Sequence, residues 1–289
     1  MTIDRPAATH QPQLQLLWQE AFGDSEEYMD NFFRTYYRPE RMIVLEEEGV
    51  VRAMTAWFDT TFVLPGGGEY RAAYLYAVAT HPDCRGRGLA GELLARADAF
   101  FRDMGIPAVT TVPARPDLHN FFGANGFREC FVLLERELTR AELPAAETEL
   151  LFPVTPKEYG ALREELLVGI PHIAYPEDAL AYQAGCCALS GGGLYAAATP
   201  AGAVCLCAEG AGEGLVVVKE ILGAAAAKGL ALADLARVAP AERWLVREPF
   251  SPNENGPAGW KFAMLKWLAP EAEKRWNWED TAYLGLAFD

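Results

Sequence analysis

The sequence of 289 residues contains no apolar stretch of about 18 residues that could cross a membrane as a helix. Its first residues, MTIDRPAATHQPQ, lack the apolar core that a secretory signal peptide needs. We therefore expect no membrane contact, and a cytoplasmic location follows from the same two absences. A hydrophobic content of 51% still allows one large domain or two smaller ones with their own cores.

The sequence also lacks the residue spacings by which proteins hold zinc. Its six cysteines include no C-x-x-C pair, and its four histidines are scattered without ligand spacing. We expect no metal site, and we interpret the cysteines as small buried thiols in a reducing compartment. They are Cys84, Cys130, Cys186, Cys187, Cys205 and Cys207.

Basic residues are scarce in this chain. It has 40 acidic against 25 basic side chains, a net charge of −15, and no lysine before Lys157. Nucleic acid binding needs a basic face, so we expect no nucleic acid partner. The negative charge favours a cationic substrate, although the same charge also serves to keep a protein in solution.

The most informative segment that is present runs from Tyr70 to Gly91, YRAAYLYAVATHPDCRGRGLAG. A β-rich run leads into a turn of glycine and arginine, and the turn opens directly into a helix with periodic apolar residues. The first turn of a helix has unpaired N–H groups and a partial positive charge, which suit an anion. Arg85 and Arg87 add charge, and Gly86 and Gly88 let the backbone come close. The segment therefore predicts a site for a phosphorylated ligand.

Two known patterns fit the same letters. Gly86-x-Gly88-x-x-Gly91 matches the dinucleotide fingerprint, but that motif needs its first glycine tight against a strand end and an acidic residue about 20 positions later. Here residues 81–85 separate the strand from the first glycine, and residues 110–112 include no acid. The second pattern, Arg85-x-x-Gly88-x-Ala90, resembles the pyrophosphate loop of GNAT acyltransferases. We favour it over the dinucleotide pattern and over a turn without a ligand.

Apolar spacing and turn residues predict the elements of the first half of the chain. Leu14 to Phe22 indicates a helix, and Asp24 with Glu27 forms a capping pair for a second helix that extends to Tyr36. Further elements are strands over 42–46, 50–64 and up to 80, a helix over 89–104, a strand over 106–112, a helix over 116–124 and a strand over 127–138. The predicted order is α-α-β-β-β-α-β-α-β.

The second half repeats much of this order. Thr155 to Glu158 is a capping box that begins a helix, and another helix spans about 177–189. Strands are expected over 194–199, 203–209, 215–222, 243–247, 261–268 and 283–288, with a helix from 222 to 235. We place the boundary in the polar segment 141–149, which gives one domain at 1–140 and another at 150–289. The turn from Ile221 to Ala224 has no arginine and no glycine loop, so the second domain is expected to lack the phosphate cradle.

Two segments carry a family resemblance. Ala77 to Gly88, AVATHPDCRGRG, is very close to the strand-and-loop signature of the GNAT N-acetyltransferases, and Pro113 to Phe127 resembles the family segment that follows it. The resemblance covers residues 1–140 well. The two-lobe plan is similar to bacterial acetyltransferases of the enhanced-intracellular-survival type without their extra C-terminal domain. It implies an α/β (α+β) GNAT fold with a mixed, mostly antiparallel, splayed sheet, followed by a degenerate GNAT-like lobe whose likeness rests mostly on element order.

The resemblance also implies roles for particular residues. The strand that ends at Thr80 would diverge from its neighbour and offer its backbone to the pantetheine arm and acetyl carbonyl of acetyl-CoA, as an added strand pairs with a sheet edge. A backbone N–H there would polarise the thioester carbonyl. The predicted cofactor-binding residues are Val78, Ala79 and Thr80 for the arm, and Arg85, Gly86, Arg87, Gly88, Leu89 and Ala90 for the pyrophosphate.

One position departs from the family pattern. Phe122 stands where relatives commonly carry the tyrosine that protonates the leaving thiolate, and phenylalanine cannot do so. Candidates to replace it are Tyr74, Tyr76 and His119, and Tyr76 is expected to face the cleft because it shares strand parity with Val78. Each candidate is also explained as a structural aromatic or a surface histidine. A coenzyme A thiolate needs no dedicated acid, since thiols have a pKa of about 8.5.

The general base is equally open. The strand from Tyr70 to Thr80 lacks the glutamate that some relatives use, and the similar two-lobe enzymes use the carboxylate at the end of their chain. This sequence ends in an apolar, strand-like stretch, Leu286-Ala287-Phe288-Asp289, whereas ordinary termini are polar. Asp289 is therefore a candidate catalytic base, and the alternative is an edge strand that ends in solvent.

Together these observations predict an acetyl-CoA-dependent N-acetyltransferase that transfers the acetyl group to a small amine by direct attack. The loop over 22–28 is among those that shape the acceptor pocket in this fold, and Asp24 and Tyr28 are its candidate substrate residues. The alternative is a non-catalytic acyl-CoA-binding or regulatory module in which Phe122 marks lost chemistry. A nucleotide-linked oxidoreductase is a third hypothesis. The apolar second half favours a homodimer, with the oligomeric state left open.

Overall fold

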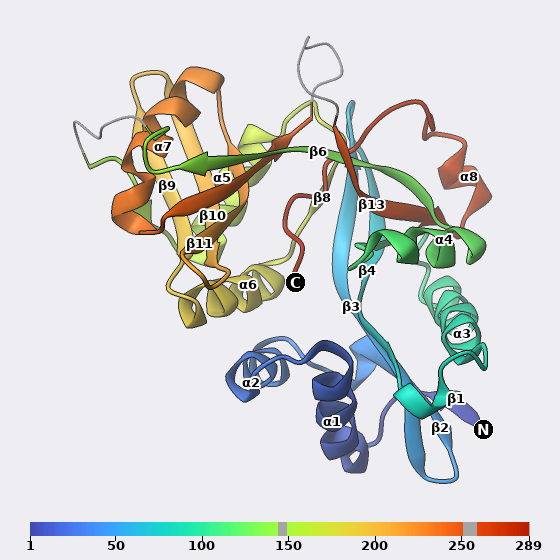
Figure 1. Cartoon of the computed structure of the whole chain (residues 1–289). Helices are drawn as coiled ribbons and strands as arrows, with labels where there is room; N and C mark the ends of the chain where they lie inside the picture. The colour runs from blue at the N-terminus through green and yellow to red at the C-terminus, as the bar shows by residue number, and fades with distance from the viewer. Residues whose placement is uncertain (144–148, 251–258, 289) are drawn as a thin grey trace. The chain divides into compact units, whose positions relative to one another are not determined.

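The computed structural model describes residues 1–143, 149–250 and 259–288. They belong to two compact units (Figure 1). The first unit consists of Met1–Phe62, Glu69–Cys130 and Ala263–Asp280, and the second of Val63–Gly68, Phe131–Phe262 and Thr281–Asp289. This division differs from the predicted domains at 1–140 and 150–289, because each unit draws on distant parts of the chain. The predicted boundary segment, 141–149, lies partly outside the described residues.

The strands of the first unit follow the order β1-β2-β3-β4-β5-β13. Neighbours from β1 to β3 are antiparallel, as are β5 and β13, whereas β4 and β5 are parallel. The predicted mixed sheet is therefore confirmed, and β1 is a short addition that the apolar pattern does not predict. These strands are β1 (Thr2–Asp4), β2 (Met42–Glu47), β3 (Val50–Leu64), β4 (Gly68–Thr80), β5 (Ala108–Thr111) and β13 (Trp260–Trp267).

Helices cover both faces of this sheet (Figure 1). On one face, α3 and α4 share an apolar core with β2 to β5. On the other face, α1 and α2 pack through aromatic rings: Trp18 and Phe32 contact Tyr76 of β4, with ring centroids 5.4 and 5.6 Å apart. The helices are α1 (Gln11–Phe22), α2 (Glu26–Thr35), α3 (Leu89–Asp103), α4 (Pro116–Ala124) and the short α8 (Pro270–Glu273).

The second unit repeats this arrangement with strands in the order β6-β12-β11-β10-β9-β7. Its parallel pair is β11 and β12, and α7 packs on the sheet in an apolar core. The predicted capping box of α5 is present, with Thr155 and Glu158 bonded to each other's backbone. No helix among the described residues is both long and apolar enough to cross a membrane. The elements are β6 (Arg128–Thr139), β7 (Phe152–Pro153), α5 (Pro156–Leu166), β8 (His172–Ala174), α6 (Glu177–Leu189), β9 (Gly193–Thr199), β10 (Gly202–Gly210), β11 (Leu215–Leu222), α7 (Ala225–Val238) and β12 (Arg243–Pro249).

Two strands are exchanged relative to the predicted order. The sequence pattern places β6 at the end of the first domain, but its residues Leu133–Thr139 pair with β12 in the second unit. β13, expected in the second domain, pairs through Met264–Trp267 with β5 in the first unit. Alternating apolar residues identify a strand and its buried face but not its partner, so the exchange has no signal in the sequence.

The end of the chain differs from the strand predicted over 283–288. Ala282 and Tyr283 form single β-bridges, and residues 284–288 are buried without regular structure. Gly285 has a φ of 74°, a left-handed conformation that interrupts a strand. Side chains of the second unit bind this backbone instead. The bonds run from Arg163 to the carbonyl of Leu284 at 3.1 Å, from Tyr175 to that of Leu286 at 2.7 Å and from Lys219 to that of Ala287 at 2.8 Å.

A buried ion pair adjoins this segment. The side chains of Arg163 on α5 and Glu220 on β11 are 1% and 0% exposed, and they meet at 2.9 Å. Tyr159 and Tyr283 donate to the same carboxylate at 2.8 and 3.1 Å. Burial raises the pKa of both tyrosines, and the carboxylate raises it further, so both hydroxyls remain protonated donors. The pair therefore joins α5, β11 and the end of the chain.

We expect Arg163→Met to lower the free energy of unfolding by about 3–5 kcal/mol, because it leaves the Glu220 carboxylate buried without its cation. The double variant Arg163→Met/Glu220→Leu should recover part of that loss, since apolar side chains can replace a buried pair. Urea denaturation followed by circular dichroism measures both. Arg243→Ala removes an exposed pair with Glu137 and should cost less than about 1 kcal/mol. An equally small loss in Arg163→Met would contradict this account.

Candidate functional site

The parallel strands β4 and β5 stop pairing before β4 ends. Their ladder runs from Ala72–Ala108 to Leu75–Thr111, where β5 ends. β4 continues, so that residues 76–80 extend past the last residue of β5. A strand edge left open in this way can pair with an extended, amide-bearing chain. This is the splayed arrangement that the sequence predicts.

A distortion of β4 sets which side chains face the opening. Ala77 has a φ of 51°, a left-handed conformation that non-glycine residues rarely adopt. Leu75 and Val78 consequently pack into the same core beneath α3, although they are an odd number of positions apart. Tyr76 points to the opposite face, where its ring contacts Trp18 of α1. The expectation that Tyr76 faces the same way as Val78 is therefore wrong, because strict alternation does not hold across Ala77.

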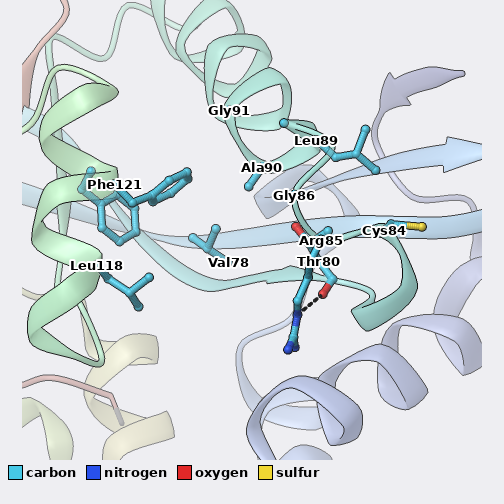
Figure 2. A pocket seen from close by; sticks show the side chains of 12 residues that line it. Val78, Thr80, Cys84, Arg85, Gly86, Leu89, Ala90, Gly91, Leu118 and Phe121 are labelled. Atoms are coloured by element: carbon cyan, nitrogen blue, oxygen red, sulfur yellow. Dashed lines mark hydrogen bonds between the residues drawn. The ribbon is translucent and has the colours of Figure 1, made fainter.

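A pocket of about 500 Å³ lies at this opening, between β4, the glycine loop, α3 and α4. Figure 2 shows Leu118 and Phe121 on α4, facing Val78 of β4 and Ala90 at the start of α3. The pocket is thus apolar beside α4 and is formed by backbone and small residues at the loop. Its lining consists of Val78, Thr80, Cys84, Arg85, Gly86, Gly88, Leu89, Ala90, Gly91, Leu118, Phe121 and Phe122.

The start of α3 has the features of an anion site. Its N-cap is Gly88, with a φ of 83°, and Gly86 has a φ of 77°. A Cβ would meet no atom within 4 Å at either position, so crowding does not require glycine there. The left-handed backbone conformation is what favours glycine at both positions. No side chain caps the helix, so the N–H groups of its first turn have no capping partner. Residues 89–91 of this turn line the pocket. Unpaired donors and the positive end of the helix dipole together favour a bound anion.

The two arginines of the loop have different surroundings. Arg85 lines the pocket, and its Nε donates to the carbonyl of Thr80 at 3.3 Å (Figure 2). Arg87 instead donates to both carboxylate oxygens of Glu47 on β2, at 3.0 and 2.6 Å. These hydrogen bonds hold the pKa of Glu47 below its usual range. Arg85 is therefore the arginine of the loop that lies at the pocket.

Most of the predicted cofactor residues line this pocket, whereas Ala79 and Arg87 do not. Ala79 is buried, 4% exposed. The pocket also includes residues that sequence reasoning missed. Leu118 and Phe121 are three positions apart on α4, so helical spacing could have identified them as one face. The other missed residues are Cys84 and Gly91, whereas Phe122, singled out at the position of the family tyrosine, does line the pocket.

The predicted acid and base residues lie away from the pocket lining or outside the described residues. His119 Nδ1 lies 2.8 Å from an oxygen of Glu129, and Tyr76 lies among the rings of α1 and α2. Phe122 lines the pocket and is 4% exposed, so a hydroxyl is absent at the position of the family tyrosine. Asp289 lies outside the described residues. The catalytic roles of these residues stay predictions.

The candidate substrate residues flank the turn between α1 and α2. Asp24 accepts a hydrogen bond from the indole N–H of Trp18 at 2.7 Å. The predicted capping role of Asp24 is wrong, because the neighbouring Ser25 caps α2 and accepts the backbone N–H of Tyr28 at 3.3 Å. Asp24 therefore fixes the end of α1, and an acceptor role for it or for Tyr28 stays a prediction.

The second unit keeps the strand geometry without the loop. The ladder between β11 and β12 ends at Val218–Val246, and β11 continues to Leu222. Gly223 follows with a φ of 141°, and a Cβ there would stand 2.7 Å from the carbonyl oxygen of Ala203. The chain thus passes directly from strand to α7 against a neighbouring strand. It offers no glycine and arginine loop at this point.

Residues 2–127 match the sequence model of a family described as Acetyltransferase (GNAT) domain. The comparison with curated proteins gives no match. The region that matches contains β4, the glycine loop, α3 and α4, and therefore every residue of the pocket lining.

Solved structures with similar folds include GNAT proteins, one of which is a tandem GNAT protein. A GCN5-related N-acetyltransferase from Kribbella flavida is 17% identical, with a TM-score of 0.67 over 92% of this chain and 72% of that chain. Eis1 from Mycobacterium abscessus is 13% identical, with a TM-score of 0.68 over 94% and 75%. A tandem GNAT protein from the clavulanic acid biosynthesis pathway is 15% identical, with a TM-score of 0.55 over 93% and 99%. Residues 2–127 are therefore similar to a GNAT acetyltransferase domain, and the chain has the fold of these solved GNAT structures.

Proposed function

We propose that this protein is an acetyl-CoA-dependent N-acetyltransferase that transfers the acetyl group to a small amine. One observation carries the proposal: the open end of β4 and the uncapped first turn of α3 line a single pocket. An extended chain that ends in a phosphorylated group needs both features, a strand edge for its amides and a helix N-terminus for its phosphates. The pantetheine arm and pyrophosphate of coenzyme A have this chemistry.

The pocket residues suit particular parts of that cofactor. The backbone of residues 78–80 would pair with the pantetheine amides, and Arg85 with the first turn of α3 would hold the pyrophosphate. Leu118 and Phe121 offer apolar contact to the arm. Arg87 would contribute less than the sequence pattern suggests, because Glu47 already binds its guanidinium.

The transfer itself needs few side chains. The amine attacks the thioester carbonyl, and a backbone N–H near Val78 or Ala79 would stabilise the oxyanion that forms. Collapse of the tetrahedral intermediate, with the amine proton passing to a base or to water, forms the amide and releases the coenzyme A thiolate. Phe122 cannot protonate this thiolate, but a thiol with a pKa of about 8.5 leaves without a dedicated acid. The net charge of −15 favours a cationic acceptor.

A non-catalytic acyl-CoA-binding module is the second candidate, and Phe122 is the observation that favours it. Steady-state thiol release with acetyl-CoA and a panel of small amines separates the two. We expect turnover on at least one amine, and calorimetry should give one coenzyme A per chain because the second unit lacks the loop. Binding of coenzyme A without turnover on any amine would favour the binding module. Two cofactors per chain would contradict the assignment of the second unit.

We expect Gly88→Ala to weaken coenzyme A binding about tenfold or more, because a Cβ enters the loop that holds the pyrophosphate. Gly105→Ala is a matched control at the other end of α3. Its φ is 67°, its Cβ also meets no atom within 4 Å, and it does not line the pocket. Both changes carry a similar backbone cost of about 1–2 kcal/mol, so the strain cancels in the comparison. Equal coenzyme A affinity of the two variants in calorimetry would show that the loop is not the binding site.

The role of Asp289 as base is tested by displacing its carboxylates. Truncation from Ala287 would also remove Phe288, whose ring is fully buried against Tyr175 and Tyr182. An Asp289→Asn chain with a short Gly-Ser extension avoids this loss. We expect it to keep its coenzyme A affinity and to lose turnover by about 10²-fold or more, as for a lost general base. The unchanged chain is the control for both carboxylates, and the same extension on the unchanged chain separates the side chain from the terminal carboxylate. A rate of the Asp289→Asn variant within about twofold of the unchanged chain would mean that the base lies elsewhere.

A further inference from the structure

The pocket depends on the separation of two helices. Its lining comes on one side from the first turn of α3 and on the other from Leu118, Phe121 and Phe122 of α4. Both helices pack on the same face of the sheet through apolar side chains, which allow small shifts. The polar contacts that join the two helices lie behind the pocket, at the end of α4.

Asn125, the C-cap of α4, contacts both sides. Its side-chain amide donates to the carbonyl of Phe121 at 2.8 Å, which fixes it to the helix that carries the apolar lining. Its side-chain oxygen lies 3.6 Å from where a Cβ on Gly91 would stand, so it lies beside the first turn of α3. One side chain is therefore bonded to α4 and lies beside α3.

Lys266 holds this junction from the exchanged strand β13. Its Nζ lies 2.5 Å from the carboxylate of Asp98 on α3 and 2.7 Å from the backbone carbonyl oxygen of Asn125. The side chains of Lys266 and Asp98 are 15% and 11% exposed. The carbonyl end of α4 carries partial negative charge, so a cation is favoured there. Lys266 also lies 5.4 Å from the ring centre of Phe127, which contributes a cation–π contact.

We propose that Lys266 and Asn125 are positioning residues that set the separation of α3 and α4, and thereby the shape of the cofactor pocket. Neither residue lines the pocket, so both act through Gly91, Phe121 and Asp98. The proposal rests on the proposed coenzyme A site. It gives β13 a function: residues near the end of the chain complete the site of a domain whose family match ends at residue 127.

A plain structural role for the ion pair makes a different prediction. A pair that only stabilises the fold lowers the melting temperature when it is removed, but leaves coenzyme A affinity unchanged well below that temperature. A pair that positions the pocket changes the affinity of a protein that is still folded. The full chain with coenzyme A as probe distinguishes these outcomes.

The test uses isothermal calorimetry at a temperature where circular dichroism shows each variant folded. Asp98→Leu/Lys266→Met removes both charges without leaving one unpaired in the interior. We expect the coenzyme A dissociation constant of this double variant to rise about tenfold. The single variant Lys266→Arg keeps a cation beside Asp98, so its dissociation constant should lie between those of the unchanged chain and the double variant. Asn125→Ala leaves the ion pair in place and should raise the dissociation constant severalfold. Lys274→Met, which removes an exposed pair with Glu271, is the control and should bind as the unchanged chain does.

Dissociation constants of the double variant and of Asn125→Ala within twofold of the unchanged chain would overturn the proposal. If the double variant does not fold, Asn125→Ala decides alone, because it removes the side chain that lies between α4 and Gly91 and keeps the buried charges paired. A chain of unchanged sequence that fails to bind coenzyme A would overturn the proposed function instead. The two failures are therefore distinguishable.

Discussion

The site depends on the left-handed backbone of Ala77 in the middle of β4. A non-glycine residue in this conformation costs about 1–2 kcal/mol, which the packing of β4 between two helical layers must offset. The distortion lies two residues after Leu75, the last residue of β4 that pairs with β5. It places Val78 toward α3 while Tyr76 stays with α1, and the strand beyond it leads into the glycine loop. Together with the end of β5 at Thr111, it determines which side chains of β4 face the pocket.

The two units use one plan for different purposes. In the first, the strand that outlasts its parallel partner leads to a loop with room for an anion at a helix N-terminus. In the second, β11 and β12 both continue past the end of their ladder, and Lys219 and Glu220 of β11 bind the backbone of Ala287 and the hydroxyl of Tyr283. Two side chains at the end of β11, Lys219 and Glu220, are therefore bound to the last residues of the chain itself. This difference explains why the second unit is expected to contribute structure without a second cofactor site.

Much of the local structure follows from the sequence, since β3 and the start of α3 match their predicted bounds and the glycine loop lies at the pocket. Contacts between distant residues do not follow from it. Arg87 belongs to the predicted loop, but its partner Glu47 lies 40 positions away and no local pattern shows the pair. The exchange of β6 and β13 is equally hidden, because the apolar runs of both strands show that they are buried but not which strand each one pairs with. Alanine gives no signal for a left-handed residue, so strand parity leads to the wrong face for Tyr76.

Amide hydrogen–deuterium exchange of the whole chain, with and without coenzyme A, tests the central claim most directly. A strand edge and a helix N-terminus that bind the cofactor through backbone groups must show it in their own amides. The account predicts slower exchange in residues 78–80 and 86–91 when coenzyme A is present, and no change in residues 219–226 of the second unit. Coenzyme A binding that leaves residues 78–91 unchanged, or that protects the second unit instead, would contradict it.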